Sequence, residues 1–114
     1  MNNMSTRDFS SKQEKCVAKL LGGQVNPNSG AGKWKKGDVL IPSADMLVEC
    51  KTSTTDKASF SIKAEWIDKN INEAHSSRVS NSCIAFNFGP DKANYFVIDE
   101  KLMKFLVEKL SEND

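Results

Sequence analysis

Apolar residues recur along this chain at two different spacings, which predict helices and strands in turn. From Ser11 to Leu21 they fall three or four residues apart, as on one face of a helix, and Gly22-Gly23 stops the pattern. The same spacing predicts a second helix from about Ile62 to His75 and a third from Glu100 to Leu110. Asp99 is placed to cap the third helix, which is expected to close the domain.

Shorter apolar runs predict strands between these helices, because they are bounded by turn residues and contain β-branched and aromatic side chains. Three strands are expected between the first two helices, and two between the second helix and the third. They cover residues 24–26, 38–41, 46–51, 83–88 and 95–98. The predicted order of elements is therefore αβββαββα.

Two of the predicted strands flank the segment Pro42-Ser43-Ala44-Asp45, which predicts a hairpin. If these four residues form the loop, counting outward places Asp38 opposite Glu49, with Cβ atoms roughly 4.5–5.5 Å apart. Side chains alternate between the two faces of a strand, so Lys51 shares the face of Glu49. Three charged groups therefore converge on one side of the sheet.

This trio would be costly in a purely structural role, because like charges opposite each other destabilise a sheet. A divalent cation removes the difficulty, and Mg²⁺ typically takes one or two protein carboxylates while keeping positions for water and phosphate. In the alternative interpretation, Asp38 is a turn residue at a strand edge, and Glu49 and Lys51 form an ordinary solvated face. A D…ExK match alone is common and does not decide between the two.

A third carboxylate, Glu14, lies on the first predicted helix. It precedes Val17, Ala18 and Leu21 by three, four and seven residues, which places it on the apolar stripe. It is either another acidic group near a metal ion or a glutamate that favours the helix dipole from the first turns.

A glycine-rich, basic segment precedes Asp38: Pro27-Asn28-Ser29-Gly30-Ala31-Gly32, followed by Lys33-Trp34-Lys35-Lys36. It lacks the residues of a phosphate-binding P-loop, so no nucleotide cofactor is expected. Three lysines and a tryptophan suit a grip on the DNA backbone with an aromatic ring available for stacking, although Trp34 could instead be buried in the core. Lys63, at the start of the second helix, would either contact phosphate or remain a surface lysine.

Composition narrows the class of protein. The 114 residues suit one domain, expected at 11–110 with flexible ends at 1–10 and 111–114. Sixteen Lys plus Arg against fifteen Asp plus Glu leave a net charge of +1, so any DNA contact needs a local basic patch. The three cysteines form no CxxC pair, which argues against disulfides and zinc and indicates a reducing cytoplasm. No apolar run suggests a signal segment or a membrane association.

The element order, together with Glu14, Asp38 and Glu49-Cys50-Lys51, resembles the PD-(D/E)xK nuclease superfamily over nearly the whole chain. Within it, the short length, the basic loop and the early glutamate look most like Holliday junction resolvases of the archaeal type and small phage-encoded relatives. The resemblance implies an α/β fold of the α+β mixed-sheet kind: a restriction-endonuclease-like αβββαββα core whose central sheet is flanked by helices. Gly37 departs from the motif, because it stands where the superfamily carries proline.

The resemblance also implies roles for the residues. Asp38 and Glu49 would hold Mg²⁺ or Mn²⁺, the backbone carbonyl of Cys50 would add a ligand, and Glu14 would complete the cluster directly or through water. Lys51 would orient the attacking water or help to deprotonate it. The predicted contacts with DNA are Ser29, Lys33, Trp34, Lys35, Lys36 and Lys63.

The function expected on this basis is a Mg²⁺-dependent, structure-selective DNA endonuclease that hydrolyses phosphodiesters with a metal-activated water. A Holliday junction resolvase is the particular expectation, acting as a homodimer in the cytoplasm of a bacterium or phage-infected host. Its near-neutral charge departs from strongly basic junction-binding relatives. The alternatives are a nicking, restriction-like or repair nuclease with the same site, and a DNA-binding module without catalysis.

Overall fold

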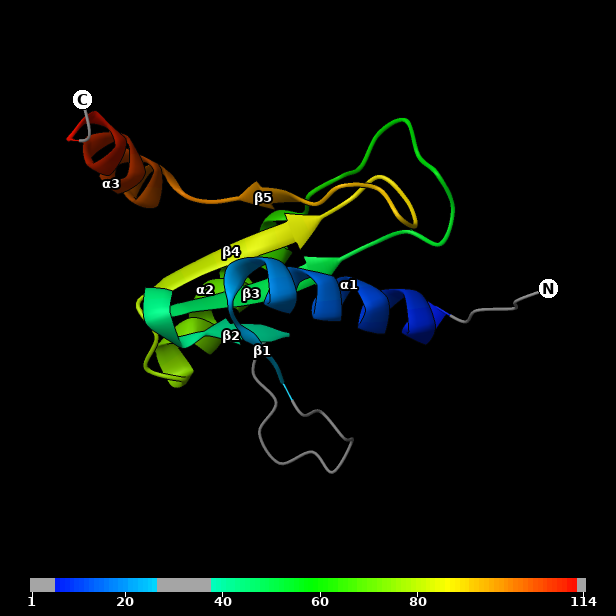
Figure 1. The fold of residues 1–114 in the computed structure, drawn as a ribbon, viewed down its shortest axis with the longest axis horizontal. Helices are drawn as coiled ribbons and strands as arrows, with labels where there is room; N and C mark the ends of the chain where they lie inside the picture. Colours follow the sequence, from blue (N-terminus) through cyan, green and yellow to red (C-terminus); the bar gives the residue numbers. More distant parts are fainter. Residues whose placement is uncertain (1–5, 27–37, 113–114) are drawn as a thin grey trace.

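The computed structural model describes residues 6–26 and 38–112, which form an α+β fold with three helices and a five-stranded mixed sheet (Figure 1). The elements follow the predicted order αβββαββα, with one short 3₁₀ turn inside the first hairpin. In chain order they are α1 (Thr6–Leu21), β1 (Gln24–Val25), β2 (Val39–Ile41), η1 (Pro42–Ala44), β3 (Met46–Lys51), α2 (Ala64–Ser76), β4 (Asn81–Phe86), β5 (Tyr95–Val97) and α3 (Glu100–Ser111).

Helix α1 begins at Thr6, five residues before the expected start at Ser11, and so includes half of the N-terminal segment expected to be flexible. Asp8 lies in its first turn, where an acidic side chain favours the helix dipole. The prediction of the start was wrong because this turn contains a single apolar residue, Phe9, which is too little for a helical period to be recognised. At the other end of the chain, α3 includes Ser111, the first residue of the expected tail.

The sheet has the order β1-β2-β3-β4-β5. Neighbouring strands are antiparallel except for β3 and β4, which are parallel and are connected through α2. The parallel pair brings the carboxyl ends of β3 and β4 to the same edge of the sheet, where Lys51 lies beside Phe86. A candidate site at the end of β3 therefore has the end of β4 next to it.

The β2–β3 hairpin has the predicted register, because Ile41 pairs with Met46 and Val39 with Val48. The four-residue connection is a 3₁₀ turn begun by Pro42 and ended by Asp45 in the left-handed conformation, with φ of 51°. Proline suits the first position of such a turn, and aspartate tolerates positive φ better than most residues. The turn chemistry thus sets the alignment of Asp38 with Glu49.

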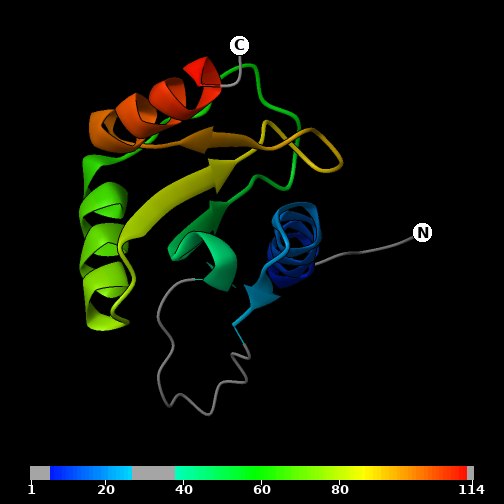
Figure 2. The same ribbon diagram turned by 60° about the vertical axis from the view of Figure 1, so that its left-hand side comes forward.

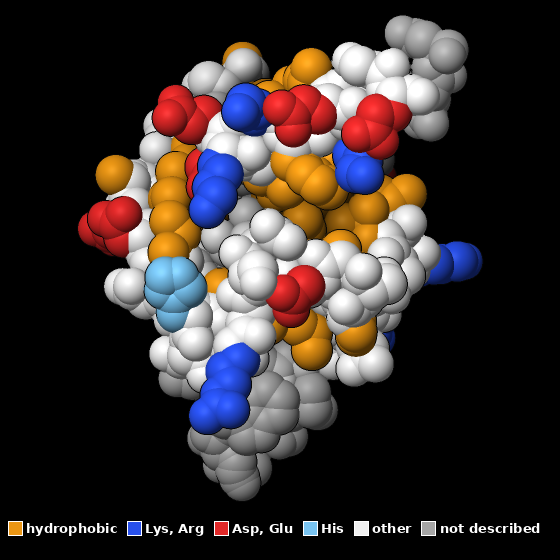
Figure 3. Space-filling model, turned by 90° about the vertical axis from the view of Figure 1, so that its left-hand side faces the viewer, with side chains coloured by type: hydrophobic (Ala, Val, Ile, Leu, Met, Phe, Trp, Pro, Cys, Tyr) orange, Lys and Arg blue, Asp and Glu red, His pale blue; other side chains and the backbone are white. Residues whose placement is uncertain are grey.

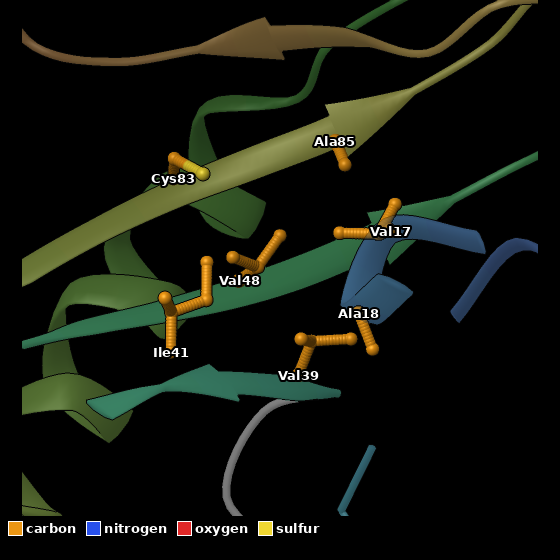
Figure 4. Close-up of a cluster of buried hydrophobic side chains, with 7 residues drawn as sticks. All are labelled: Val17, Ala18, Val39, Ile41, Val48, Cys83 and Ala85. Carbon is orange, nitrogen blue, oxygen red and sulfur yellow. The ribbon is translucent and has the colours of Figure 1, made fainter. Parts of the chain in front are cut away.

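Helices α1 and α2 cover opposite faces of the sheet (Figure 2). The larger buried cluster lies between α1 and the sheet, and Figure 4 shows its side chains pointing toward one another from α1, β2, β3 and β4: Val17, Ala18, Val39, Ile41, Val48, Cys83 and Ala85. On the other face, Leu47 packs with Ala74 of α2 and with Val79. Strand β3 therefore lies at the centre of the sheet with packed side chains on both of its faces.

Strand β4 spans Asn81–Phe86, two residues earlier than the expected 83–88. The strand begins with polar residues, because Asn81 already pairs with Met46 in the parallel ladder. A prediction from apolar runs does not detect such a start. The strand ends before Asn87, whose side chain accepts a hydrogen bond from Thr52 Oγ1 at 2.7 Å.

Helix α3 forms where it was predicted, and the Asp99 side chain caps it by accepting a hydrogen bond from the Leu102 N–H at 2.8 Å. The expectation that it closes the domain is wrong for the described residues, because none of its residues is buried. Among the described helices, none combines the length and apolar character needed to cross a membrane.

Candidate functional site

Asp38 lies immediately before β2 and is attached to β3 through both its backbone and its side chain. Its N–H donates to the Val48 carbonyl at 3.0 Å, and its Oδ2 accepts from the Cys50 N–H at 2.8 Å. Since Val39 pairs with Val48, the next positions outward are those of Asp38 and Glu49. The hairpin therefore holds the two carboxylates at adjacent positions, as the sequence predicted.

Burial disfavours the ionised form of both carboxyl groups. The pKa of Glu49, which is 9% exposed, is raised first by desolvation and then by the charge of Asp38. Desolvation also raises the pKa of Asp38, although the Cys50 N–H and the Lys51 ammonium lower it in part. A cation between the two carboxylates would offset the cost of their desolvation and their mutual repulsion.

Lys51 lies between a carboxylate and an aromatic ring. Its Nζ is 3.6 Å from Glu49 Oε2 and 4.4 Å from the centre of the Trp66 ring on α2. An ammonium over the face of a tryptophan is attracted by the electrons of the ring, and the attraction strengthens when water is excluded. The Lys51 side chain is 27% exposed, so it is held in place yet reachable from solvent.

Helix α2 contributes two further charged residues, Lys69 and Glu73, which are not among the residues predicted from the sequence. Lys69 lowers and Glu73 raises the pKa values of both Asp38 and Glu49, and the two side chains pair at 3.6 Å. In the sequence they resemble an ordinary i,i+4 surface pair. Their spacing of three and seven residues from Trp66 places them on its face of the helix, and this signal could have identified them.

Glu14 acts from the other side of β3. The pKa of the Cys50 thiol is raised first by burial, and then by the charges of Asp38 and Glu14. The Cys50 side chain alternates with Glu49 and packs against the cluster beneath α1. Across residues 6–26 and 38–112, no three His, Cys, Asp or Glu side chains gather in a way that could hold a metal ion. The structure thus brings Asp38, Glu49 and Lys51 together without gathering Glu14 into a three-carboxylate cluster with them.

Of the predicted DNA contacts, Lys63 lies beside the site. It is the N-cap residue of α2, and its Nζ is 5.8 Å from the Trp66 ring, which Lys51 also contacts. The others lie outside the described residues: Ser29, Lys33, Trp34, Lys35 and Lys36. Lys51 and Lys63 therefore both lie near the Trp66 ring, next to the carboxylate pair.

Five aromatic rings form a continuous row next to Lys51. Consecutive ring centres are 5.2–6.4 Å apart, and the row runs from Trp66 through Phe60 and Phe86 to Phe88 and Tyr95. Tyr95, at its outer end, is 54% exposed. The row supports α2 and the ends of the strands, and its exposed end offers a face for stacking.

A buried glutamine, Gln13 of α1, fixes the backbone at the end of β3. Its Nε2 donates to the Lys51 carbonyl at 2.9 Å and to Asn94 Oδ1 at 3.1 Å, while Asn94 also accepts from Asn87. Neither charge nor a motif marks Gln13 as a site residue in the sequence. The available signal was its position four residues before Val17, on the apolar stripe of α1.

The donor set fits a hard divalent cation, because the two adjacent carboxylates supply oxygen ligands and gain from neutralisation. No family model, curated protein or solved structure matches this chain.

Proposed function

We propose that this protein is a metal-dependent endodeoxyribonuclease of the PD-(D/E)xK class. The observation that carries the proposal is the pairing of Asp38 and Glu49, two desolvated carboxyls with raised pKa values, with the Lys51 ammonium 3.6 Å from Glu49. The αβββαββα order and the parallel β3–β4 pair support a restriction-endonuclease-like core.

Within that class, we propose that it acts on branched DNA, as a Holliday junction resolvase. The support is the resemblance to the archaeal-type resolvases and the two lysines, Lys51 and Lys63, that lie near the Trp66 ring. A nicking, restriction-like or repair nuclease would use the same residues. The choice among these substrates depends on surfaces beyond the carboxylate pair.

The residues of this chain divide the chemistry between them. Asp38 and Glu49 would hold Mg²⁺ or Mn²⁺, which supplies the Lewis acidity that stabilises charge on a phosphate. Lys51 donates hydrogen bonds from its ammonium to the attacking water or to a phosphate oxygen, and Trp66 keeps it aimed at that position. Gln13 fixes the carbonyl of Lys51, so the side chain starts from a rigid backbone.

The test is cleavage by the purified protein of labelled four-way junction, linear duplex and single-stranded DNA, in Mg²⁺ or in EDTA. We expect cutting in Mg²⁺ only, with the junction cut fastest. Equal rates on junction and duplex would remove the resolvase proposal and leave the nuclease proposal intact. Absence of cutting on all three DNAs would contradict both and favour a DNA-binding module.

A further inference from the structure

Three side chains lie in one line across the sheet, at the edge where β3 and β4 end. Lys51 of β3 pairs with Phe86 of β4, and Phe86 pairs with Tyr95 of β5. Paired residues of neighbouring strands point to the same face, which here is the face that α2 covers, because Trp66 of α2 contacts Lys51. The ends of β3 and β4 and the start of β5 meet at this edge (Figure 1). The line therefore connects Lys51 with the last strand of the sheet.

The outer end of this line is accessible to a ligand. The Tyr95 ring packs against Phe86 at 5.9 Å and against Phe88 at 5.8 Å, measured between ring centres. These contacts cover only part of the residue, because Tyr95 is 54% exposed. An aromatic ring that is held by other rings and remains half open can stack with a planar group.

The support beneath Tyr95 is fixed by two loops that contact each other. The Phe88 carbonyl accepts a hydrogen bond from the Lys57 N–H at 2.7 Å. Gly89 has φ of 148°, and a Cβ at this position would lie 2.5 Å from Asp56 Oδ1, so glycine is what lets the loops approach so closely. A ring held on a rigid support loses little freedom when a ligand stacks on it.

The distance along the line matches a few nucleotides of a DNA strand. Lys51 and Tyr95 are two strands apart, which places their Cα atoms roughly 10 Å from each other at about 4.8 Å per strand. The nucleotides of a stacked DNA strand advance by about 3.4 Å each, so this distance covers about three of them, and fewer where the strand is extended. A phosphate at Lys51 therefore leaves a base of the same strand within reach of Tyr95.

We propose that Tyr95 stacks with an unpaired base of the DNA substrate, up to about three nucleotides from the phosphate that is cut. This role rests on the nuclease function proposed above, because Lys51 and the carboxylate pair place that phosphate. Bases inside a duplex have both faces covered by their neighbours, whereas an unpaired base is free to stack on an aromatic side chain. Taking a base out of the duplex costs least where it is mismatched or already single-stranded. Tyr95 thus favours branched DNA with unpaired nucleotides beside the branch point over fully paired DNA.

The exposed apolar residues of α3 take no part in this contact. Figure 3 views the molecule from the side at which β3 and β4 begin, opposite to the edge that carries Lys51, and shows a broad hydrophobic area there. Phe96, the other exposed aromatic residue of β5, pairs with Ala85 and so points to the opposite face of the sheet. Of the exposed large hydrophobic residues in the described part of the chain, Tyr95 is the one in line with Lys51.

The test compares two four-way junctions of one sequence, the first fully paired and the second with two unpaired thymidines at the branch point. Dissociation constants are measured by fluorescence anisotropy in EDTA, where no cutting is expected. We expect wild type to bind the second junction more tightly. Tyr95→Leu should weaken that binding by about 5- to 150-fold, the range for one base stacked on an aromatic ring.

Two matched variants separate the ring from the fold. Tyr95→Phe keeps the ring and should bind both junctions as wild type does. Phe96→Leu removes an aromatic residue that is 36% exposed on the opposite face of the same strand, and it should also bind as wild type does. Equal affinity of wild type for the two junctions, unchanged binding by Tyr95→Leu, or an equal loss in Phe96→Leu would overturn the stacking role.

A second measurement keeps this role open to contradiction if Tyr95→Leu fails to fold. The fluorescent base 2-aminopurine, in place of an unpaired thymidine, should lose emission when wild type binds, and should not do so when it is paired within an arm. An equal change at both positions would overturn the stacking role. Cutting in Mg²⁺ without a preference for unpaired bases would contradict Tyr95 alone. Binding that depends on Tyr95, without cutting in Mg²⁺, would support the stacking and contradict the nuclease proposal.

Discussion

The Glu49 carboxyl opposes folding in the metal-free protein once it ionises. Its pKa in the folded state is raised above its ordinary value of 4.5, so stability present below pH 4.5 is lost as the pH rises through the raised pKa. The variant Glu49→Gln has no ionisable group at this position, so it does not lose stability in this way. In EDTA at pH 8 the variant should therefore melt at a higher temperature than wild type, and the difference should disappear toward pH 4.

The same melting experiment tests the carboxylates as a cation site. At ten times the dissociation constant, Mg²⁺ should stabilise wild type by about 1.4 kcal/mol. Glu49→Gln should lose that gain, whereas Asp68→Asn, the loss of an exposed carboxylate on α2, should keep it. A Mg²⁺ gain as large in Glu49→Gln as in wild type would exclude Glu49 as a ligand.

The contact between Lys51 and Trp66 should affect catalysis separately from stability. Trp66→Leu removes the ring that holds the ammonium, and a cation–π contact of about 0.5–2 kcal/mol corresponds to a roughly 3- to 30-fold loss of cleavage rate. Phe60→Leu is the matched control, because Phe60 belongs to the same aromatic row and contacts Trp66 without contacting Lys51.

Both leucine variants should lower the melting temperature, but only Trp66→Leu should slow cleavage. The variant Trp66→Phe keeps an aromatic ring and should therefore retain most of the wild-type cleavage rate. Equal loss of rate in the two leucine variants would show that the row acts through packing alone.

At the scale of elements, the amide of Gln13 joins α1 to β3 and β4, because it donates to the carbonyls of Lys51 at 2.9 Å and Ala85 at 3.3 Å. Gln13→Leu should lower the free energy of unfolding by about 1–3 kcal/mol, because the Lys51 carbonyl and Asn94 lose a buried donor. Gln24→Leu, at an exposed position of β1, should change it by less than about 0.5 kcal/mol. Urea unfolding measures both, and equal effects would contradict the anchoring role of Gln13.

The hairpin was predictable because its register depends on local information. Pro42 and Asp45 define the turn, and alternation along β3 then assigns Glu49 and Lys51 to one face. The contribution of α2 was not predictable in this way. Which charges of a helix face a distant strand depends on how the parallel β3–β4 connection places the helix, and Lys69 and Glu73 looked like a solvated pair.

At the scale of the whole molecule, the pattern in α3 revealed the helix but not its surroundings. Periodicity shows which residues share an apolar face, and Met103 and Leu106 do so as expected. It does not show whether the same chain or a second one covers that face. The order αβββαββα was predictable from periods and turns, whereas the position of α3 depends on contacts between elements.

The central claim is that the Asp38–Glu49–Lys51 cluster cleaves DNA with a divalent cation. Its most direct test is the initial rate in Mg²⁺, on whichever DNA wild type cuts fastest, for wild type, Asp38→Asn and Asp68→Asn. Loss of a residue that only supports a metal ligand can lower activity by up to roughly 100-fold, so loss of a ligand itself should lower the cleavage rate by at least that factor. We predict that loss for Asp38→Asn and an unchanged rate for Asp68→Asn. A rate for Asp38→Asn equal to that of wild type would contradict the account.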